Sequence, residues 1–535
     1  MERLGRRGMS AVTRTHLPHG LVFVAFLAIY LLTAPGYMWN TDGWTRYLVA
    51  IGLVEHGRPI LPPSMLPGSH WVVRGPDGNA YSYFGVGQSL AFIPFYLAGK
   101  GLKSLVGASA ADWPAVLASF LNSVVAALLA VAVYALARGI GHSPRVALRT
   151  TALSGLGTIV WAHSRDNYDH LIETLCLTAT LAILVPSLDR RSRRGCVIAG
   201  LVFGCGLVTR LSISFALPGL GLLLAGGLGR PRVTGRRLLD GAVFTAGMLP
   251  AGAFVVLYNW SRFGRPFATG YETRPLNWFG MPIWKGATAL LVSPGRGLVW
   301  YVPLVLAVPF LARWLYRRRP GLALGLVAIS LGYLLAYSQF ERLGLWGWGP
   351  YYLLPLMPIV AVVWAEALSR WPLVPRASRL ALSALVAVSI LIQALSATVA
   401  YRRTYVEATV AHVPFDQGID WHPRWSLLLR QGGNLGHAIG QFHRSTPLRS
   451  VGEPASHEYQ LTHDIGLNTI DWWWVRARYR GARWTWVAPL ALGAVLAMSL
   501  RGFHRVTAPR AASARPLAPP ATASTDEAGS LPRAD

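Results

Sequence analysis

Charged residues are scarce in this chain of 535 residues, at 14%, whereas soluble globular proteins carry about 25%. Acidic residues are the scarcer kind: 23 Asp and Glu stand against 50 Lys and Arg, a formal net charge of +27. In a soluble protein such a basic balance would indicate a nucleic-acid partner. Here the basic residues cluster in short loops between apolar runs, which is typical of the cytoplasmic loops of a membrane protein. We therefore expect no nucleic-acid partner.

Cysteine is nearly absent, and so are repeats. The three cysteines, Cys176, Cys196 and Cys205, all fall within apolar runs. They have neither the spacing of a metal site nor a paired disulfide framework, so we interpret them as small apolar residues. The sequence also contains no internal repeat of the kind from which many transporters are built.

Long apolar runs are what the sequence has in abundance. Hydrophobic residues make up 53% of the chain, and runs of membrane-spanning length recur throughout. The sequence therefore predicts an all-α polytopic membrane protein. The first span is expected at residues 21–35, after a basic N-terminus without a small-residue cleavage site, which predicts a retained signal anchor.

The apolar run at residues 85–102 decides the orientation of everything that follows. It is short, and Gly and Pro interrupt it. If it crossed the membrane, every later basic loop would lie outside. If it lies in the outer interface, five basic loops fall on the cytoplasmic side together: residues 137–149, 189–195, 229–237, 317–321 and 369–379. Because Lys and Arg accumulate in cytoplasmic loops, we predict about twelve spans, both termini inside and an interfacial helix in the first outer loop.

This orientation divides the chain into five parts. They are a cytoplasmic basic N-terminus (1–20), a transmembrane core (21–400) with outer loops at 36–85, 260–297 and 340–352, an outer segment (401–483), a last transmembrane helix (484–503) and a cytoplasmic tail (504–535). The tail is rich in Ala, Pro and Ser, a composition typical of disorder.

Acidic residues occur at two places on the predicted outer side. Asp42 follows the first span, and Asp166 and Asp169 precede a later span with His170 beside them. Ionisable residues at membrane level are rarely accidental, and a polar cavity walled by apolar helices can supply a general base. Each acid could instead cap a helix, and Asp42, after Thr41, suits an N-cap. The residues alone leave both interpretations open.

The segment that contains Asp42 has a helical pattern. Residues 44, 47, 48, 51 and 54 are apolar, which places them on one face of a helix. We expect this helix to lie on the membrane surface with Asp42 at its polar beginning. A lipid-borne headgroup would arrive at the same water–lipid boundary.

The order of these features resembles the GT-C class of membrane glycosyltransferases, which use polyprenyl-phosphate sugars. The similarity is greatest to protein O-mannosyltransferases and lipid A aminoarabinose transferases. In that class an Asp after the first span is followed by a Tyr and an interfacial helix ending near Gly, which here are Asp42, Tyr47 and Gly57. A Ser-Arg pair with a later Asp ends the third span, here within residues 164–169.

Three further segments are similar to a less characterised bacterial branch of the class: residues 262–275, 293–303 and 346–358. The resemblance covers roughly residues 21–360. The chain departs from the class at Gly43, where many members have a second acid, and at the sequence FGVGQS, which replaces a Lys-Pro-Pro or His-Pro-Pro motif.

The resemblance implies a transfer chemistry. Asp42 would act as the single general base of an inverting displacement, and Asp169 would be a second catalytic carboxylate. The leaving phosphate needs cationic donors. Candidates for binding the donor phosphate or the acceptor are Arg165, Arg210, Asp166, His170, Arg274 and Glu272. Asp42 and Asp169 with a phosphate would suit Mg²⁺ or Mn²⁺, although the sequence establishes neither a metal nor another cofactor.

The resemblance also implies partners and a location. The partners would be a polyprenyl-phosphate sugar donor, membrane lipids and an envelope glycan, lipid or protein as acceptor. The protein would span the inner (plasma) membrane with its active site on the extracytoplasmic face. Two other functions stay open: a multi-span secondary transporter and a non-catalytic assembly factor for envelope polysaccharide.

Overall fold

The computed structural model describes residues 11–65, 71–107, 112–230, 232–273, 279–341, 343–344, 346–414, 418–441, 448–451 and 456–507. Within these residues, seven helical segments are long and apolar enough to cross a membrane. They are α4–α5 (Trp113–Ser119 and Leu121–Gly139), α8 (His170–Arg190), α11 (Gly235–Phe263), α15 (Pro320–Tyr337), η5–α16 (Tyr351–Leu356 and Met357–Ser369), α17 (Arg376–Thr398) and α23 (Val487–Thr507).

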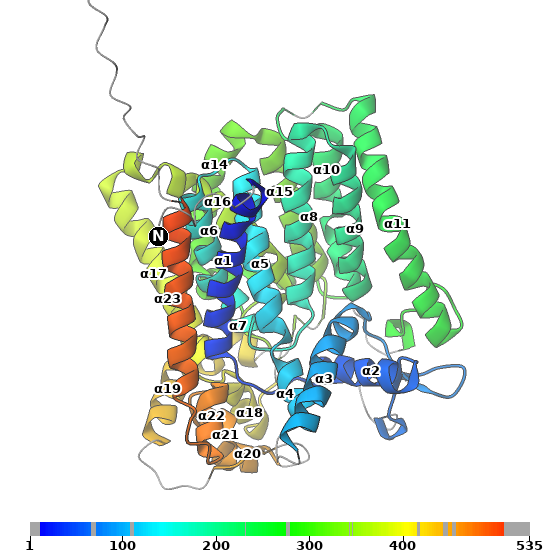
Figure 1. Cartoon of the computed structure of the whole chain (residues 1–535), viewed down its shortest axis with the longest axis vertical. Coiled ribbons are helices and arrows are strands. Elements are labelled where there is room, and N and C mark those ends of the chain that lie inside the picture. Colours follow the sequence, from blue (N-terminus) through cyan, green and yellow to red (C-terminus); the bar gives the residue numbers. More distant parts are fainter. Residues whose placement is uncertain are drawn as a thin grey trace, which may run out of the picture.

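Further helices run alongside these seven in the same bundle (Figure 1). They are α1 (Ala11–Thr33), α6 (Pro144–Leu156), α9 (Arg193–Thr209), α10 (Leu217–Gly226) and α14 (Val308–Arg318). Helix α1 packs against α5 and α23, α9 against α8 and α11, α10 against α15, and α14 against α16. The architecture is that of a multi-pass, all-α membrane protein, as the sequence predicts.

Two predicted boundaries shift. Helix α1 begins at Ala11, ten residues before the span expected at 21–35, so half of the predicted N-terminal segment is helical. The last helix covers Val487–Thr507 rather than 484–503. Residues 1–10 and 508–535, and with them nearly all of the expected disordered tail, lie outside the described residues.

Helices α2 (Thr41–His56) and α3 (Gly87–Val106) lie across one end of the bundle (Figure 1). Between them is a small antiparallel sheet of order β1-β3-β2, with β1 at Ile60–Leu61, β2 at Val72–Arg74 and β3 at Ala80–Ser82, and the turn η1 at Pro63–Met65. The run at residues 85–102 thus forms α3, which packs on α2. This arrangement agrees with the interfacial interpretation of that run, and we call this end of the bundle the α2 end.

The remaining short elements connect the long helices. They are α7 (Val160–His163), η2 (Leu211–Ala216), η3 (Tyr271–Thr273), α12 (Ile283–Val292), α13 (Leu298–Tyr301), η4 (Pro303–Ala307) and η6 (Trp371–Leu373). The segment expected at 401–483 folds into α18 (Arg402–Val410), η8 (Pro423–Trp425), α19 (Leu427–Gln441), α20 (His457–His463), α21 (Ile465–Asn468) and α22 (Trp473–Tyr479).

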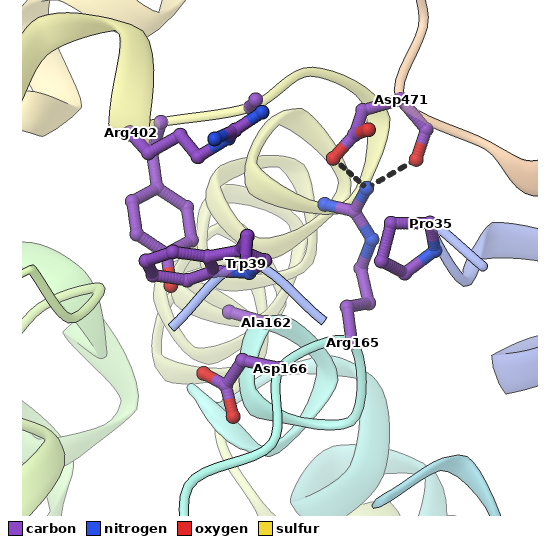
Figure 2. Close-up of a pocket in the computed structure, with 9 residues that line it drawn as sticks. Pro35, Trp39, Ala162, Arg165, Asp166, Arg402 and Asp471 are labelled. Carbon is purple, nitrogen blue, oxygen red and sulfur yellow. Dashed lines mark hydrogen bonds and ion pairs between the residues drawn. The ribbon is translucent and has the colours of Figure 1, made fainter. Parts of the chain in front are cut away.

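A buried ion pair attaches this C-terminal segment to the bundle. Arg165, between α7 and α8, donates through Nη2 to the carboxylate of Asp471 at 3.1 Å and to its carbonyl at 2.6 Å (Figure 2). Its other donors reach the carbonyl oxygens of Thr33 and Ser396, both at 2.6 Å. One guanidinium therefore joins the ends of α1 and α17 to the C-terminal segment.

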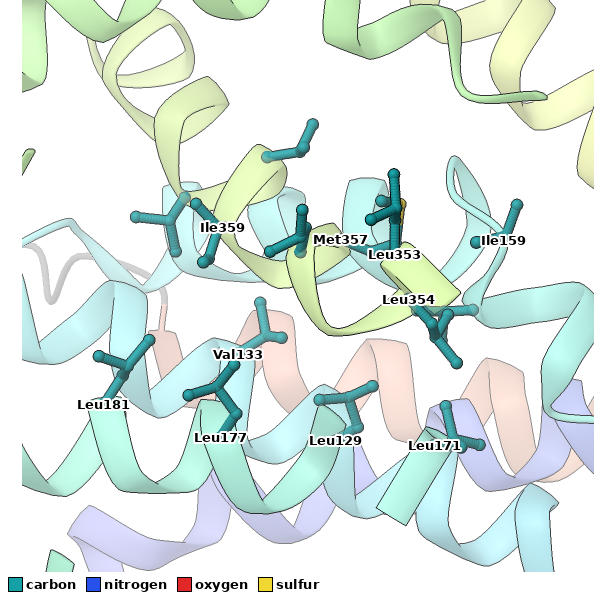
Figure 3. Packing of buried hydrophobic residues seen from close by; sticks show 14 of the residues in the cluster. Leu129, Val133, Ile159, Leu171, Leu177, Leu181, Leu353, Leu354, Met357 and Ile359 are labelled. Carbon is teal, nitrogen blue, oxygen red and sulfur yellow. The ribbon is translucent and has the colours of Figure 1, made fainter. Parts of the chain in front are cut away.

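The core lies where α5, α8 and α16 meet (Figure 3). The η5–α16 segment is the most enclosed candidate span, with 83% of its most apolar stretch buried, whereas α11 and α23 have only 11% buried and lie at the periphery. Packing in lipid depends on close van der Waals contact and is helped by small residues. Gly200 of α9 and Gly247 of α11 each face backbone of the other helix with no room for a Cβ.

The basic loops gather at the end opposite to α2. Glu366 of α16 is fully buried there and contacts His142 at 3.4 Å, Arg318 at 3.2 Å and Arg370. Arg319 pairs with Asp189 at 2.7 Å. These contacts join four of the five basic loops, those around residues 140, 189, 318 and 370, so the sequence-based grouping of the loops agrees with their position in space.

Candidate active site

Asp169 is the centre of a charged cluster at the α2 end. It directly precedes α8, so its carboxylate lies where that helix begins. Arg46 of α2 donates to Oδ2 at 2.8 Å, and Arg210, at the end of α9, donates to Oδ1 at 3.0 Å. The side chains of Arg46 and Asp169 are 1% and 3% exposed. Two arginines, 123 residues before and 41 residues after Asp169 in the sequence, thus meet at one buried carboxylate.

Asp42 reaches the same cluster through Arg46. It lies one helical turn before Arg46, and its Oδ2 is 4.0 Å from Nη1 of that arginine. The side chain of Asp42 is 23% exposed, so it forms the open edge of the cluster. One guanidinium therefore contacts Asp42 and Asp169, the two acids that the sequence expects to share a pocket.

The capping alternative for Asp42 is wrong. The N-cap of α2 is Asn40, whose side-chain oxygen accepts from the backbone N–H of Gly43 at 2.5 Å. Gly43 also explains the missing second acid. A Cβ there would lie 2.6 Å from the Cβ of Asn167, so α2 packs too closely on the turn before α8 to carry any side chain at this position.

Arg46 is the residue that sequence reasoning missed. Its guanidinium carbon lies 3.7 Å from the centre of the Phe84 ring, a cation–π contact. Within the described part of the chain, its Nε and Nη1 have no hydrogen-bond partner. The available signal was the spacing of Asp42 and Arg46, which places opposite charges four residues apart on one helical face. A buried arginine with unused donors can bind an anion.

Arg210 is held by a second carboxylate that the sequence did not single out. Its Nε lies 3.5 Å from Glu173, which is fully buried in the first turn of α8. Glu173 in turn accepts hydrogen bonds from Ser212 at 2.8 Å and Tyr333 at 2.7 Å. The side chain of Arg210 stays 18% exposed, so this arginine is both fixed in orientation and open to a ligand.

His170 borders the cluster on its aromatic side. Its ring lies edge-on to Tyr351 at 4.7 Å and tilted against Tyr352 at 5.3 Å. The side chain is only 4% exposed, and Nδ1 is 3.4 Å from the carboxylate of Asp169. Neither ring nitrogen has a hydrogen-bond partner among the described residues.

Two predicted ligands of the site have structural partners instead. All the donating nitrogens of Arg165 are engaged, by Asp471 (Figure 2) and by the main-chain carbonyls of Thr33 and Ser396. Asp166 contacts Nδ1 of His163 at 2.6 Å and accepts from the N–H of Tyr168 at 3.2 Å. Arg165 and Asp166 therefore shape the turn that presents Asp169.

The connection between α11 and α12 adds an aromatic residue to the cluster. Tyr271 lies within electrostatic reach of Arg210, Arg46, Asp169 and Asp42. Burial raises the pKa of its hydroxyl to about 12, against the lowering effect of the two arginines, so Tyr271 keeps its proton at neutral pH.

The two other predicted binding residues fall in the same connection. Glu272 is exposed and accepts from the N–H and the hydroxyl of Thr269 at 2.9 and 2.7 Å, within its own turn. Arg274 lies outside the described residues.

The residue set suits an anion better than a metal ion. Both carboxylate oxygens of Asp169 already accept from arginines, and Arg46 lies between Asp169 and Asp42. Within the ranges that the structure covers, no group of three or more His, Cys, Asp or Glu could hold a metal. The residues present do not fit a resident Mg²⁺ or Mn²⁺.

No protein family and no curated protein matches this sequence. Solved structures do show a likeness of fold. ArnT from Cupriavidus metallidurans in the apo state has a TM-score of 0.45 and 14% identity over 85% of this chain and 86% of that chain. The same protein bound to undecaprenyl phosphate has a TM-score of 0.42 and 16% identity over 85% of each.

An archaeal oligosaccharyltransferase, AglB from Archaeoglobus fulgidus in complex with an inhibitory peptide and a dolichol-phosphate, has a TM-score of 0.44 and 14% identity. The match covers 76% of this chain and 59% of that chain. The likeness concerns the fold alone. At these scores and identities the likeness assigns no substrate and no residue.

Proposed function

We propose that this protein is a glycosyltransferase that moves a sugar from a polyprenyl-phosphate donor to a cell-envelope acceptor, with Asp42 as general base. The observation that carries the proposal is the contact of one buried guanidinium, that of Arg46, with both Asp42 and Asp169. A cation with unused donors and a partly exposed carboxylate one turn away are the two groups that this transfer needs.

The donor phosphate binds between Arg46 and Arg210. Charge-assisted hydrogen bonds to phosphate are stronger than neutral ones, and both arginines are already fixed by Asp169 at 2.8 and 3.0 Å. Fixed donors stabilise charge that develops on the leaving oxygen without reorganising at the moment of reaction. Asp169 therefore acts as a positioning residue, because both of its oxygens are occupied by the arginines.

Asp42 supplies the base. As the acceptor hydroxyl attacks the anomeric carbon, its proton passes to the carboxylate of Asp42. The bond from the anomeric carbon to the phosphate oxygen breaks, and the phosphate leaves with the bonding electrons. A single displacement of this kind inverts the anomeric centre. The position of Asp42 at the open edge of the cluster supports this role, since an acceptor can approach it from solvent.

The proposed location follows from charge. The basic loops lie at the end of the bundle opposite to α2, and positively charged loops stay in the cytoplasm. The α2 end, with the proposed site, then faces the extracytoplasmic side of the inner (plasma) membrane. The donor is lipid-borne, and α2 lies where its headgroup would arrive.

A transfer assay tests the proposal. Membranes containing wild type or Asp42→Asn receive a radiolabelled polyprenyl-phosphate sugar, and labelled acceptor is measured. Loss of a general base lowers the rate by about 10²–10⁴-fold. Asp189→Asn is the control, because Asp189 is 44% exposed and pairs with Arg319 at the opposite end. Transfer that persists in Asp42→Asn at unchanged protein level overturns the assignment, and uptake of a solute into vesicles without any transfer favours the transporter.

A further inference from the structure

A second candidate site lies on the other flank of α2. Trp44, Tyr47 and Ile51 follow each other at helical spacing and point away from the Asp42–Arg46 flank. With α3 and the start of α4 they line an open groove of about 550 Å³. The groove contains none of the residues placed in the sugar-transfer site.

One wall of the groove is apolar and aromatic. Tyr47 is 2% exposed and packs edge-on against Tyr96 of α3 at 6.0 Å, while Trp44 keeps 40% of its surface exposed. Pro114 of α4, which also lines the groove, approaches α3 so closely that a Cβ on Gly99 has no room. Such a wall accepts hydrocarbon.

The rim of the groove is charged, with both signs present. Lys100, Lys103 and Ser104 lie on one face of α3, and Asp112 stands before α4. Lys100 pairs with Glu55 at 2.7 Å. Among the residues that the structure describes, Lys103 has no ion-pair partner, and its side chain is exposed. A headgroup that carries both a phosphate and an ammonium group matches this rim.

The groove also lies at the level where lipid headgroups occur. Pro114 is the second residue of the candidate span 113–139, so the groove lies where that span begins. On α3 the apolar side chains of Leu90, Leu97 and Leu105 are 43%, 48% and 85% exposed. Trp and Tyr favour this boundary, and Lys reaches from it toward the headgroups.

We propose that the groove between α2, α3 and α4 binds a zwitterionic glycerophospholipid, with its phosphate at Lys103 and Lys100, its ammonium group at Asp112 and an acyl chain along Trp44 and Tyr47. This site is separate from the sugar-transfer site and does not depend on the transfer function.

Native mass spectrometry of the purified full-length protein tests the site. Phosphatidylethanolamine and phosphatidylglycerol with identical acyl chains are offered at equal concentration. Wild type should retain phosphatidylethanolamine in preference. Lys103→Ala should weaken its retention about fivefold, the effect of one lysine near a lipid phosphate. Asp112→Asn should abolish the preference over phosphatidylglycerol. Both residues are exposed, so the variants are expected to fold.

Lys285→Ala is the matched control, since Lys285 is an exposed lysine on α12 outside the groove. Retention that is equal in wild type and Lys103→Ala overturns the proposal, and so does equal retention of the two lipids by wild type. A polyprenyl phosphate that displaces phosphatidylethanolamine in wild type, but has no effect in Lys103→Ala, would assign the groove to the donor's carrier instead.

Discussion

The guanidinium of Arg165 and the carboxylate of Asp471 lie 3.1 Å apart, although 306 residues separate them in the sequence. Asp471 also lies 3.5 Å from Arg476. Burial raises the pKa of the Asp471 carboxyl, and the neighbouring arginines, first Arg165, act against that rise. The turn that presents Asp169 is therefore fixed from the far end of the chain.

Removing this pair should destabilise the protein. Arg165→Ala leaves Asp471 buried beside one arginine fewer, which costs about 3–5 kcal/mol for a fully buried pair. The measurement is thermal unfolding of the purified protein in detergent, together with proteolysis of residues 401–483. The exposed pair of Arg58 and Asp77 provides the control, because Arg58→Ala should cost no more than about 1 kcal/mol. Equal unfolding temperatures for both variants would contradict the structural role of Arg165.

Arg46 should be the most sensitive cation of the site. Arg46→Lys keeps the charge but has a single ammonium group, which cannot contact both Asp42 and Asp169. We expect kcat/KM for sugar transfer to fall about 10²–10³-fold, as for loss of one fixed donor to a developing anion. Arg74→Lys, at an exposed position of strand β2, should leave the rate unchanged.

A double-mutant cycle extends this prediction. Because Asp169 works through Arg46 and Arg210, the losses from Arg46→Lys and Asp169→Asn should be less than additive. Full additivity would show that Asp169 acts on the substrate independently of Arg46.

Gly43 should not tolerate a side chain. Gly43→Ala places a methyl group 2.6 Å from the Cβ of Asn167, so α2 must move away from the turn before α8. The expected result is a large loss of transfer with little loss of folding, because the contact lies at the site and outside the core. Gly57→Ala affects the other end of the same helix, where a Cβ meets no neighbour but φ is +66°, and should lower stability instead. The measurement compares transfer rate with unfolding temperature for both variants.

The turn before β3 should loosen in acid. Hydrogen bonds, first from the side chain of Asn79 and then from Tyr81, lower the pKa of Asp77 to about 2, from about 3.9 in an unfolded chain. A lowered pKa means that the stabilisation is complete above about pH 4 and is lost as the pH falls toward 2. Hydrogen exchange of residues 72–82 should therefore accelerate in this window, and Asp77→Asn should remove that pH dependence.

The sequence predicted the parts of the fold that follow from local composition. Apolar runs identified the spans, and the placement of Lys and Arg grouped the basic loops. The spacing of residues 44 to 54 identified α2. These features could be predicted because each depends only on residues that are close together in the chain.

The site was predicted only in part, because its contacts are long-range. Asp42 and Asp169 were named from the order of motifs, and the structure brings both to Arg46. The roles of Arg46 and Glu173 could not be predicted from the sequence. Each role depends on a partner that is distant in the chain: Arg46 contacts Asp169, and Glu173 contacts Arg210. Arg165 was expected at the phosphate because its Ser-Arg motif is local in the sequence. Its partners in the structure, Thr33, Ser396 and Asp471, are distant in the chain and could not be predicted from that motif.

The division of tasks between Asn40 and Asp42 has a practical consequence. The amide of Asn40, which does not titrate, starts α2. Neutralising residue 42, by acid or by the change to Asn, therefore alters the local charge without fraying the helix. Helical content that is unchanged in Asp42→Asn, while transfer declines, would assign the loss to the missing charge and not to unfolding of α2.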